Sequence, residues 1–263
     1  MNMYFAGVDL GSLTAKAVII KNGDIVCHRV IQSGYNSAEN ANRVMNACLE
    51  DTALTLEDLE YIISTGYGRV NVPFAHKQVT EITCHAKGAN YLFPSARTVI
   101  DIGGQDSKAM SIDGTGRVKD FVMNEKCAAG TGRFLEVMAH ALEVDLDSFG
   151  PLSLTSESPA KISSMCTVFA ESEVISQIAQ GLPKQDIIAG IHDAITSRVA
   201  SMARRVPIAE DVVLTGGVSK NVGVVKALSK NLGYDIQVSE LSQIAGALGA
   251  ALLAREAGEK AAD

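Results

Sequence analysis

One motif occurs twice in this chain, at equivalent points of two segments with the same order of expected strands. Residues 9–16 read DLGSLTAK and residues 101–108 read DIGGQDSK, so both copies fit D-x-G-x-x-x-x-K, 92 residues apart. Each copy starts where an apolar run ends, at Asp9 or Asp101, and a second apolar run follows. The repeat predicts a duplicated fold in which each half opens with a strand, a glycine turn and a return strand.

Apolar periodicity predicts further strands and helices in both halves. Each return strand leads through Asn22-Gly23 or Asp113-Gly114, dipeptides typical of hairpin turns, into a third strand. The further strands are expected at 18–20, 25–31, 109–112, 118–122 and 212–215. Helical spacing is found at 37–49, 132–142, 170–181, 185–205, 221–232 and 242–257. We therefore expect two α/β halves with mixed sheets facing each other, with residues 151–161 as the one flexible insert.

The two halves are expected to form a single duplicated unit. No linker rich in Pro, Gly and Ser separates them, so the boundary near residue 95 is a hinge at most. Residues 1–95 with 242–263 are expected to form the first half, and residues 96–241 the second. At 263 residues the chain is long enough to bury a large core without disulfide bonds.

Composition excludes several classes of protein. The net charge is −7 and no basic run is present, so binding to nucleic acid through phosphate contacts is not expected. A hydrophobic content of 47 % excludes disorder, no apolar run is long enough to span a membrane, and residues 1–9 lack the pattern of a signal peptide. Five cysteines cannot all pair within the chain. The expected location is the cytoplasm, where thiols stay reduced and serve more often as ligands.

The two glycine turns have the chemistry of phosphate sites. A tight turn at Gly11 leaves backbone N–H groups directed at open space, where phosphate oxygens bind well, and Ser12, Thr14 and Lys16 can add donors. The carboxylates of Asp9 and Asp101 cannot bind phosphate, but each can hold a hydrated Mg²⁺ that does. A single such motif is often only a hairpin turn. Two copies in a duplicated fold can clamp one polyphosphate from both sides.

A third segment points to a nucleoside. Residues 215–219 read TGGVS, between a short strand and a helix, and paired glycines let the backbone approach a flat ligand. Taken alone, Ser219 is more simply explained as the cap of the following helix. Together, DLGSLTAK, DIGGQDSK and TGGVSKN resemble the phosphate and adenosine motifs of the actin, sugar-kinase and heat-shock ATPase superfamily. That resemblance implies two ribonuclease-H-like halves (an actin-like ATPase fold) with mixed sheets around a cleft that binds ATP and Mg²⁺.

Residues for nucleotide binding and hydrolysis follow from these motifs. Gln105 stands near the position where some members of the superfamily have an acidic catalytic residue, and a neutral amide orients water but is a poor base, so slow hydrolysis is expected. The candidate catalytic residues are Gln105, Asp9 and Asp101. The candidate nucleotide-binding residues are Gly11, Ser12, Leu13, Thr14, Ala15, Lys16, Gly103, Gly104, Gln105, Gly130, Gly132, Gly216, Gly217, Val218 and Gln243.

Two of the cysteines are candidate iron ligands. Cys127 and Cys166 each precede a predicted helix, and the positive end of a helix dipole favours the thiolate, the form that binds iron. A role as small buried apolar residues is the common alternative. Their spacing does not by itself identify a cluster. Glu171 and Glu173 favour the same helix end, and a contact of one of them with nucleotide stays open.

The segments around these cysteines carry a more specific resemblance. NEKCAAGTGRFLE and SMCTVFAESEVIS closely resemble the activators of 2-hydroxyacyl-CoA dehydratases, a family that includes the ATPase subunits of benzoyl-CoA reductase and the reductases of double-cubane cluster proteins. TGYGR, HKQVTEITCHAKGA and DIIAGIH resemble further segments of that family, over residues 4–255. The resemblance implies one 4Fe–4S cluster per homodimer, with two thiolates from each chain at Cys127 and Cys166. Cys27, Cys48 and Cys84 are then expected to be packing residues.

The resemblance also implies a mechanism and partners. Reduced ferredoxin or flavodoxin would load the cluster, ATP would close the cleft, and one electron would pass to a partner iron–sulfur enzyme. That partner would be a 2-hydroxyacyl-CoA dehydratase, or a protein like benzoyl-CoA reductase or a double-cubane protein. A small-molecule kinase of the same superfamily is the alternative, but no acceptor-binding insert is evident and Gln105 is not a base. A nucleotide-gated scaffold would need a peptide-binding appendage. His28, His76, His85, His140 and His192 show no metal spacing and are expected at the surface or as caps.

Overall fold

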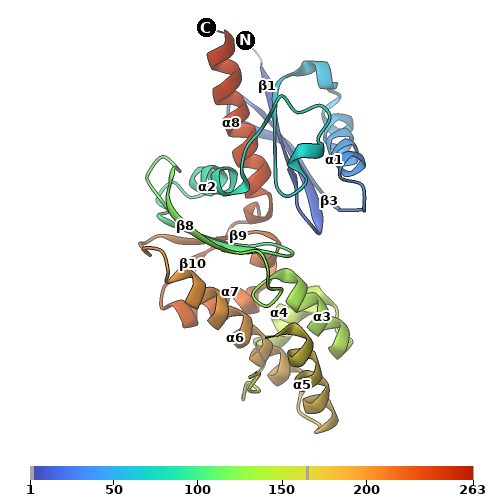
Figure 1. The fold of residues 1–263 in the computed structure, drawn as a ribbon, viewed down its shortest axis with the longest axis vertical. Coiled ribbons are helices and arrows are strands. Elements are labelled where there is room, and N and C mark those ends of the chain that lie inside the picture. The colour runs from blue at the N-terminus through green and yellow to red at the C-terminus, as the bar shows by residue number, and fades with distance from the viewer. Residues whose placement is uncertain (1–2, 164–165, 263) are drawn as a thin grey trace. The chain divides into compact units, whose positions relative to one another are not determined.

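The structure is a computed structural model, and it describes residues 3–163 and 166–262. The described chain divides into two compact units, each built around its own five-stranded mixed sheet (Figure 1). Unit 1 comprises Met1–Ala96, Ile112–Lys119 and Leu241–Asp263, and unit 2 comprises Arg97–Ser111 and Asp120–Glu240. Ser164 and Met165, in the second cysteine segment, lie outside the described residues. The α/β class with mixed sheets is confirmed.

The sheet of unit 1 has the strand order β3-β2-β1-β4-β5. Its strands are β1 (Tyr4–Leu10), β2 (Thr14–Lys21), β3 (Asp24–Gln32), β4 (Leu59–Thr65) and β5 (Lys77–Gln78). β1 pairs antiparallel with β2 and parallel with β4, so the first three strands form the expected meander. The turn between β2 and β3 has positive φ at Asn22 (53°) and Gly23 (100°), the backbone that an Asn-Gly hairpin favours.

Helices cover both faces of this sheet. α1 (Ser37–Thr52) buries its apolar stripe on one face, and Asn36 caps it by accepting hydrogen bonds from two backbone N–H groups. α2 (Glu81–Leu92) and α8 (Ala245–Ala262) cover the other face (Figure 1). Three short 3₁₀ turns, Leu56–Asp58, Arg69–Asn71 and Ser242–Ile244, connect elements of unit 1. β4 and α2 were not anticipated from the sequence.

α2 and α8 pack backbone against backbone. A Cβ atom added to Gly88 would fall on the carbonyl oxygen of Ala245, and one added to Gly249 would fall on the carbonyl oxygen of Cys84. We call this contact, between Cys84–Gly88 and Ala245–Gly249, the α2–α8 seam. It explains why the C-terminal helix is so rich in glycine and alanine, since only the smallest residues allow helices to approach so closely.

The sheet of unit 2 repeats the first in the order β10-β9-β6-β7-β8. Its strands are β6 (Thr98–Ile102), β7 (Ser107–Ile112), β8 (Val118–Asn124), β9 (Val212–Thr215) and β10 (Ile236–Gln237). The helices are α3 (Gly132–Leu142), α4 (Leu146–Ser153), α5 (Thr167–Ala179), α6 (Lys184–Ala203) and α7 (Val222–Leu232). Together with β6 and β9 they enclose one apolar core, which includes Phe134, Phe149 and Ile191.

Two local expectations were wrong. Residues 151–153 belong to α4 rather than to a flexible insert. Phe149, Gly150 and Ser153 of this helix are buried, and this packing outweighs the backbone hydrogen bond that Pro151 cannot donate. The rest of the insert is tied to α6, since Ser156 Oγ donates to Asp186 Oδ1 at 2.6 Å. The second hairpin is also longer than the Asp113-Gly114 dipeptide suggests. It runs from β7 to β8 with its positive φ at Gly116.

Within the described residues, no helix combines the length and the apolar character that crossing a bilayer requires.

Candidate functional site

The first glycine turn places Asp9 and Lys16 opposite each other. They are paired residues of β1 and β2, and Lys16 Nζ lies 3.1 Å from Asp9 Oδ2. Between them, Gly11 N–H donates to Thr14 O at 3.1 Å, which closes the turn. Ser33 holds its outer side, because Ser33 Oγ donates to Gly11 O at 3.1 Å. The lysine ammonium therefore neutralises the carboxylate beside the turn.

Three residues from distant segments enclose the Asp9 carboxylate, and none of them is among the predicted site residues. Gly66, in the TGYGR segment, has φ +83°, and a Cβ there would strike Asp9 Oδ1. A Cβ on Gly246 would lie 3.1 Å from Asp9 Oδ2 and 2.8 Å from His85 Nε2. His85 is therefore a buried neighbour of Asp9, not a surface residue. The TGYG spacing of Gly66 was the one available signal.

The second glycine turn has the same construction in unit 2, with a deeper lysine. Lys108 pairs with Asp101 across β6 and β7, and its Nζ lies 3.3 Å from Asp101 Oδ2 and 2.7 Å from Asp106 Oδ2. Thr215 Oγ1 donates to Asp101 Oδ1 at 2.8 Å, so both carboxylate oxygens of Asp101 are engaged. The Lys108 and Asp101 side chains are each only 2 % exposed. One buried ammonium thus serves two carboxylates.

Three predicted nucleotide segments meet in unit 2. The N–H groups of Gly132 and Arg133, at the start of α3, donate to Gly103 O and Gly104 O, both at 2.8 Å. A Cβ on Gly132 would lie 3.1 Å from Gly103 O and 3.4 Å from Val218 Cγ2. The second turn, the start of α3 and the segment after β9 are therefore in contact. Gln105 lies at the exposed tip of this turn.

In the segment after β9, Ser219 does not cap the following helix, as the simpler explanation of this segment had it. Gly217–Lys220 form a 3₁₀ turn, and Ser219 Oγ donates to Gly216 O at 2.7 Å. Asn221 is the residue that caps α7, accepting from Val224 N–H at 3.0 Å. The Ser219 side chain therefore stabilises the turn of the glycine segment from within. In unit 1, Gln243 is half-buried in the 3₁₀ turn before α8.

Cys127 lies in the loop between β8 and α3, and Asn124 holds that loop. Asn124 Nδ2 donates to Cys127 O at 2.8 Å and to Ala129 O at 3.2 Å, and Cys127 N–H donates back to Asn124 Oδ1 at 3.3 Å. The loop ends at Thr131, four residues after Cys127, and Cys127 is half-buried against the core of unit 2. The backbone of this cysteine is thus fixed directly ahead of α3.

Cys166 is exposed and occupies the N-cap position of α5. The N–H of Ala170 donates to its carbonyl oxygen at 2.9 Å, so the thiol stands at the positive end of the helix dipole. Glu173, on the same helix, accepts hydrogen bonds from the backbone N–H and the hydroxyl of Ser163. This carboxylate fastens the segment ahead of Cys166 to α5, and α5 in turn packs against α3.

The other three cysteines are buried, in line with a packing role. Desolvation raises the pKa of the Cys84 thiol to about 12, and it also raises the pKa of Cys27 and Cys48. A thiol with a raised pKa stays protonated at neutral pH and is a poor ligand. The described residues contain no group of three or more His, Cys, Asp and Glu side chains arranged to hold a metal ion.

His192, like His85, is buried rather than at the surface, where the histidines were expected. It is 1 % exposed, with its ring edge against Phe149 and its Nε2 3.3 Å from Asn221 Nδ2. Burial lowers its pKa from 6.5 to about 4. The expectation is correct for His28, His76 and His140, which are exposed, and His76 Nδ1 accepts from Ile62 N–H at 3.0 Å.

Comparison with known proteins finds close relatives over nearly the whole chain. An activator of lactoyl-CoA dehydratase from Anaerotignum propionicum is 51 % identical over 259 residues, which cover 98 % of this chain and 100 % of that protein. The solved structure of the activator of the 2-hydroxyisocaproyl-CoA dehydratase from Clostridium difficile, with bound ADPNP, superposes with a TM-score of 0.95 at 46 % identity. That superposition covers 99 % of this chain and 97 % of the other.

A more distant likeness concerns the fold alone. MreB 5 of Spiroplasma citri, solved with AMPPNP, matches with a TM-score of 0.57 at 11 % identity, over 100 % of this chain and 99 % of that one. The fold is therefore that of the actin-like ATPases, as the repeat and its motifs suggested. The sequence also matches the BadF/BadG/BcrA/BcrD ATPase family over residues 6–254. With both the family match and the relatives spanning the chain, this protein belongs to the BadF/BadG/BcrA/BcrD ATPase family.

Proposed function

We propose that this chain is an ATP-hydrolysing activator that delivers single electrons to a partner iron–sulfur dehydratase acting on a 2-hydroxyacyl-CoA. Its relatives that activate such dehydratases, and the ADPNP-bound relative of the same fold, support this choice. A benzoyl-CoA-reductase-like or double-cubane partner is the variant of the same proposal. Reduced ferredoxin or flavodoxin is the proposed electron donor.

The observation that carries the proposal is the short path from the second glycine turn to a cysteine loop. Gly103 and Gly104 accept hydrogen bonds from the first two N–H groups of α3, and Cys127 precedes that helix by five residues. Any movement of the turn when a phosphate binds is thereby transmitted to the start of α3. Because α3 packs against α5, the same movement reaches the element that begins at Cys166.

For nucleotide, we propose roles that follow the construction of the two turns. The proposed halves are residues 1–95 with 242–263 and residues 96–241, and each would contribute one glycine turn to the binding of ATP. The backbone N–H groups of both turns would hold the phosphates, Gln105 would orient water, and the segment at Gly216 would approach the adenosine. Asp9 and Asp101 would each hold a hydrated Mg²⁺ through water, with Lys16 and Lys108 limiting the local excess of negative charge.

For the iron–sulfur cluster, the donor set of the chain fits half of a site. Cys127 and Cys166 are the two cysteines that are not buried, and both stand ahead of helices that pack on each other. A 4Fe–4S cluster takes four thiolates, so we propose that two copies of the chain share one cluster on a twofold axis. When bound, the cluster would supply a one-electron couple. The helix dipole at Cys166 would favour the thiolate, and Asn124 would keep the Cys127 loop in place.

The ATP dependence follows from differential binding. Nucleotide shifts the chain toward a closed form only if the closed form binds nucleotide more tightly than the open form does. The hydrogen bonds from α3 to the second turn would couple this open–closed equilibrium to the cysteine loops. Hydrolysis would then release the closed form and make electron delivery directional.

Anaerobic purification of Cys166→Ser tests the proposal. We expect the parent protein to be brown, with four irons and four sulfides per two chains, and the variant to lose the cluster and remain folded by circular dichroism. Cys27→Ala, at a buried thiol, is the matched control and should keep full iron. A Cys166→Ser protein that kept a full cluster and its electron transfer would overturn the proposal.

A further inference from the structure

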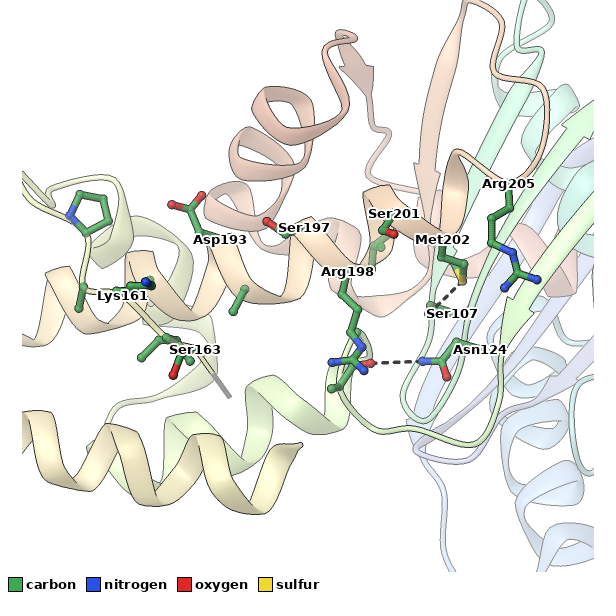
Figure 2. Close-up of a pocket in the computed structure, with 18 of the residues that line it drawn as sticks. Ser107, Asn124, Lys161, Ser163, Asp193, Ser197, Arg198, Ser201, Met202 and Arg205 are labelled. Carbon is green, nitrogen blue, oxygen red and sulfur yellow. Dashed lines mark hydrogen bonds between the residues drawn. The ribbon is translucent and has the colours of Figure 1, made fainter. Parts of the chain in front are cut away.

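Unit 2 contains a large groove whose lining, apart from Gly130, lies outside the residues proposed for nucleotide and cluster binding. Its volume is about 850 Å³, and one side is formed by α6 (Figure 2). The other sides are formed by the end of β8, the loop that follows it and residues 159–163. Along α6 the lining residues Gly190, Ala194, Ser197 and Ser201 are small, so the groove stays open between the larger side chains of the same face.

The charge in this groove is opposite to that of the chain. Lys161, Arg198 and Arg205 line it, and Asp193 is the one acidic residue among its lining residues. Asp193 already forms an ion pair with Lys230, whose Nζ lies 3.9 Å from Asp193 Oδ2. The chain as a whole carries −7, so a lining with a net positive charge is a local exception. Such a patch attracts acidic partners and steers their approach.

The groove also adjoins both cysteine segments. Asn124, which fixes the backbone of Cys127, is part of its lining (Figure 2). Ala129 and Gly130, at the other end of that loop, line it as well. Gly130 of the loop approaches Arg198 so closely that a Cβ there would lie 3.7 Å from Arg198 Cδ. Ser163, three residues before Cys166, lines the groove as well. A partner seated here would therefore stand beside both candidate ligands.

We propose that this groove is the docking site of an acidic electron-carrier protein that reduces the cluster. This inference rests on the proposed function. It adds the surface through which the proposed cluster receives its electrons. Acidic side chains of the carrier would enter the groove between Arg198 and Arg205 at one end and Lys161 at the other. The reduced carrier loses one electron and the cluster gains one, with no bond made or broken. Short-lived redox complexes use small, charged contact areas of this kind.

The occupant that fits this groove is a carrier whose negative charge is concentrated in the face that meets it. The −7 of this chain opposes any acidic protein over the rest of the surface, so such a concentrated charge is drawn to this patch. The exposed hydroxyls of Ser197 and Ser201 also keep the groove wet, which suits a complex that must dissociate after each electron.

The experiment uses the anaerobic, cluster-loaded protein and an acidic two-cluster ferredoxin as the carrier. Arg198→Gln/Arg205→Gln removes two groove charges and keeps hydrogen-bonding side chains of moderate length. Arg43→Gln/Lys226→Gln is the matched control, because it removes two exposed cations outside the groove. Binding is measured by interferometry at several salt concentrations, and cluster reduction by stopped-flow absorbance. Reduction by a photoreduced deazaflavin, which needs no docking site, is measured in parallel.

We expect the groove variant to lose affinity for ferredoxin by about tenfold or more and to show a weaker salt dependence, with the control near the parent. Its reduction by ferredoxin should slow by a similar factor while reduction by deazaflavin stays unchanged. Equal affinities for the groove variant and the control would overturn the inference. A change of the variant from dimer to monomer in light scattering would overturn it too, because the groove would then be a contact between copies. A parent protein without a cluster would instead refute the proposed function.

Discussion

Asp9 is enclosed tightly, and a comparison of Gly66 beside it with a distant glycine of the same backbone conformation shows the effect of that enclosure. Gly66 and Gly233 have nearly the same left-handed φ, +83° and +84°, but only Gly66 approaches Asp9, while Gly233 faces open space. We expect Gly233→Ala to lower the free energy of unfolding by about 1 kcal/mol through backbone strain alone. Gly66→Ala should lower it by roughly 2–4 kcal/mol, because its methyl group must also displace the Asp9 carboxylate and the Leu10 carbonyl.

Urea unfolding of the two alanine variants measures that difference. The comparison is matched, since both changes add the same atom at the same kind of backbone. Equal losses in the two variants would show that Asp9 and the Leu10 carbonyl both move aside freely, and that Gly66 is required for its φ alone.

His192 makes the stability of unit 2 sensitive to acid. Its pKa is about 4 in the folded chain and 6.5 when unfolded, so above pH 6.5 both states are neutral and the residue contributes no pH dependence. As the pH falls from 6.5 toward 4, the unfolded state takes up a proton that the folded state refuses, and up to about 3 kcal/mol of stability is lost.

His192→Gln should remove that part of the acid loss. We expect urea unfolding of the variant to show about 3 kcal/mol less decline between pH 7 and pH 4 than the parent, while His140→Gln, at an exposed position, should behave as the parent does. A parallel decline in all three proteins would mean that His192 accepts its proton without unfolding.

At the scale of elements, α3 connects the second glycine turn with a cysteine loop. Gly132 lies at the contact, where a larger side chain would push the helix away from Gly103 and Val218. We expect Gly132→Val to uncouple nucleotide from the cluster: the rate at which a chelator removes iron should change severalfold with ADPNP in the parent and not at all in the variant. Ala179→Val, at the exposed end of α5, is the control. An undiminished response in Gly132→Val would place the coupling elsewhere.

The elements also show which parts of the site the sequence could predict. The motif spacing places Asp and Lys on paired strands around a four-residue turn, so the spacing alone predicts the pairs Asp9–Lys16 and Asp101–Lys108. His85 could not be predicted, because it approaches Asp9 only through the packing of α2 against α8, beside Gly246. The groove was equally hidden, since separate segments contribute its cations. α4 was missed because its eight residues with an internal Pro151 give a weak helical pattern, and the burial of Phe149 that holds the helix is not visible in the sequence.

For the whole molecule, the proposed sharing of one cluster ties iron content to assembly. We expect chelation of iron to convert the dimer to a monomer in light scattering while the helical signal in circular dichroism is kept, because each chain has its own cores. Cys166→Ser should be a monomer before and after chelation. A parent protein that stayed dimeric without iron would show that other surfaces hold the two copies together.

The α2–α8 seam bears on how such a chain can diverge. Where side chains fill the space, as under α1, a larger residue at one position is compensated by a smaller one opposite, and lineages can drift through paired changes. At Gly88 and Gly249 the opposing atoms are backbone carbonyls, which no substitution makes smaller. Accepted substitutions in unit 1 should therefore accumulate on the α1 face and be almost absent from the seam. Deep mutational scanning would record this bias as a difference in tolerated substitutions between the two faces of one sheet.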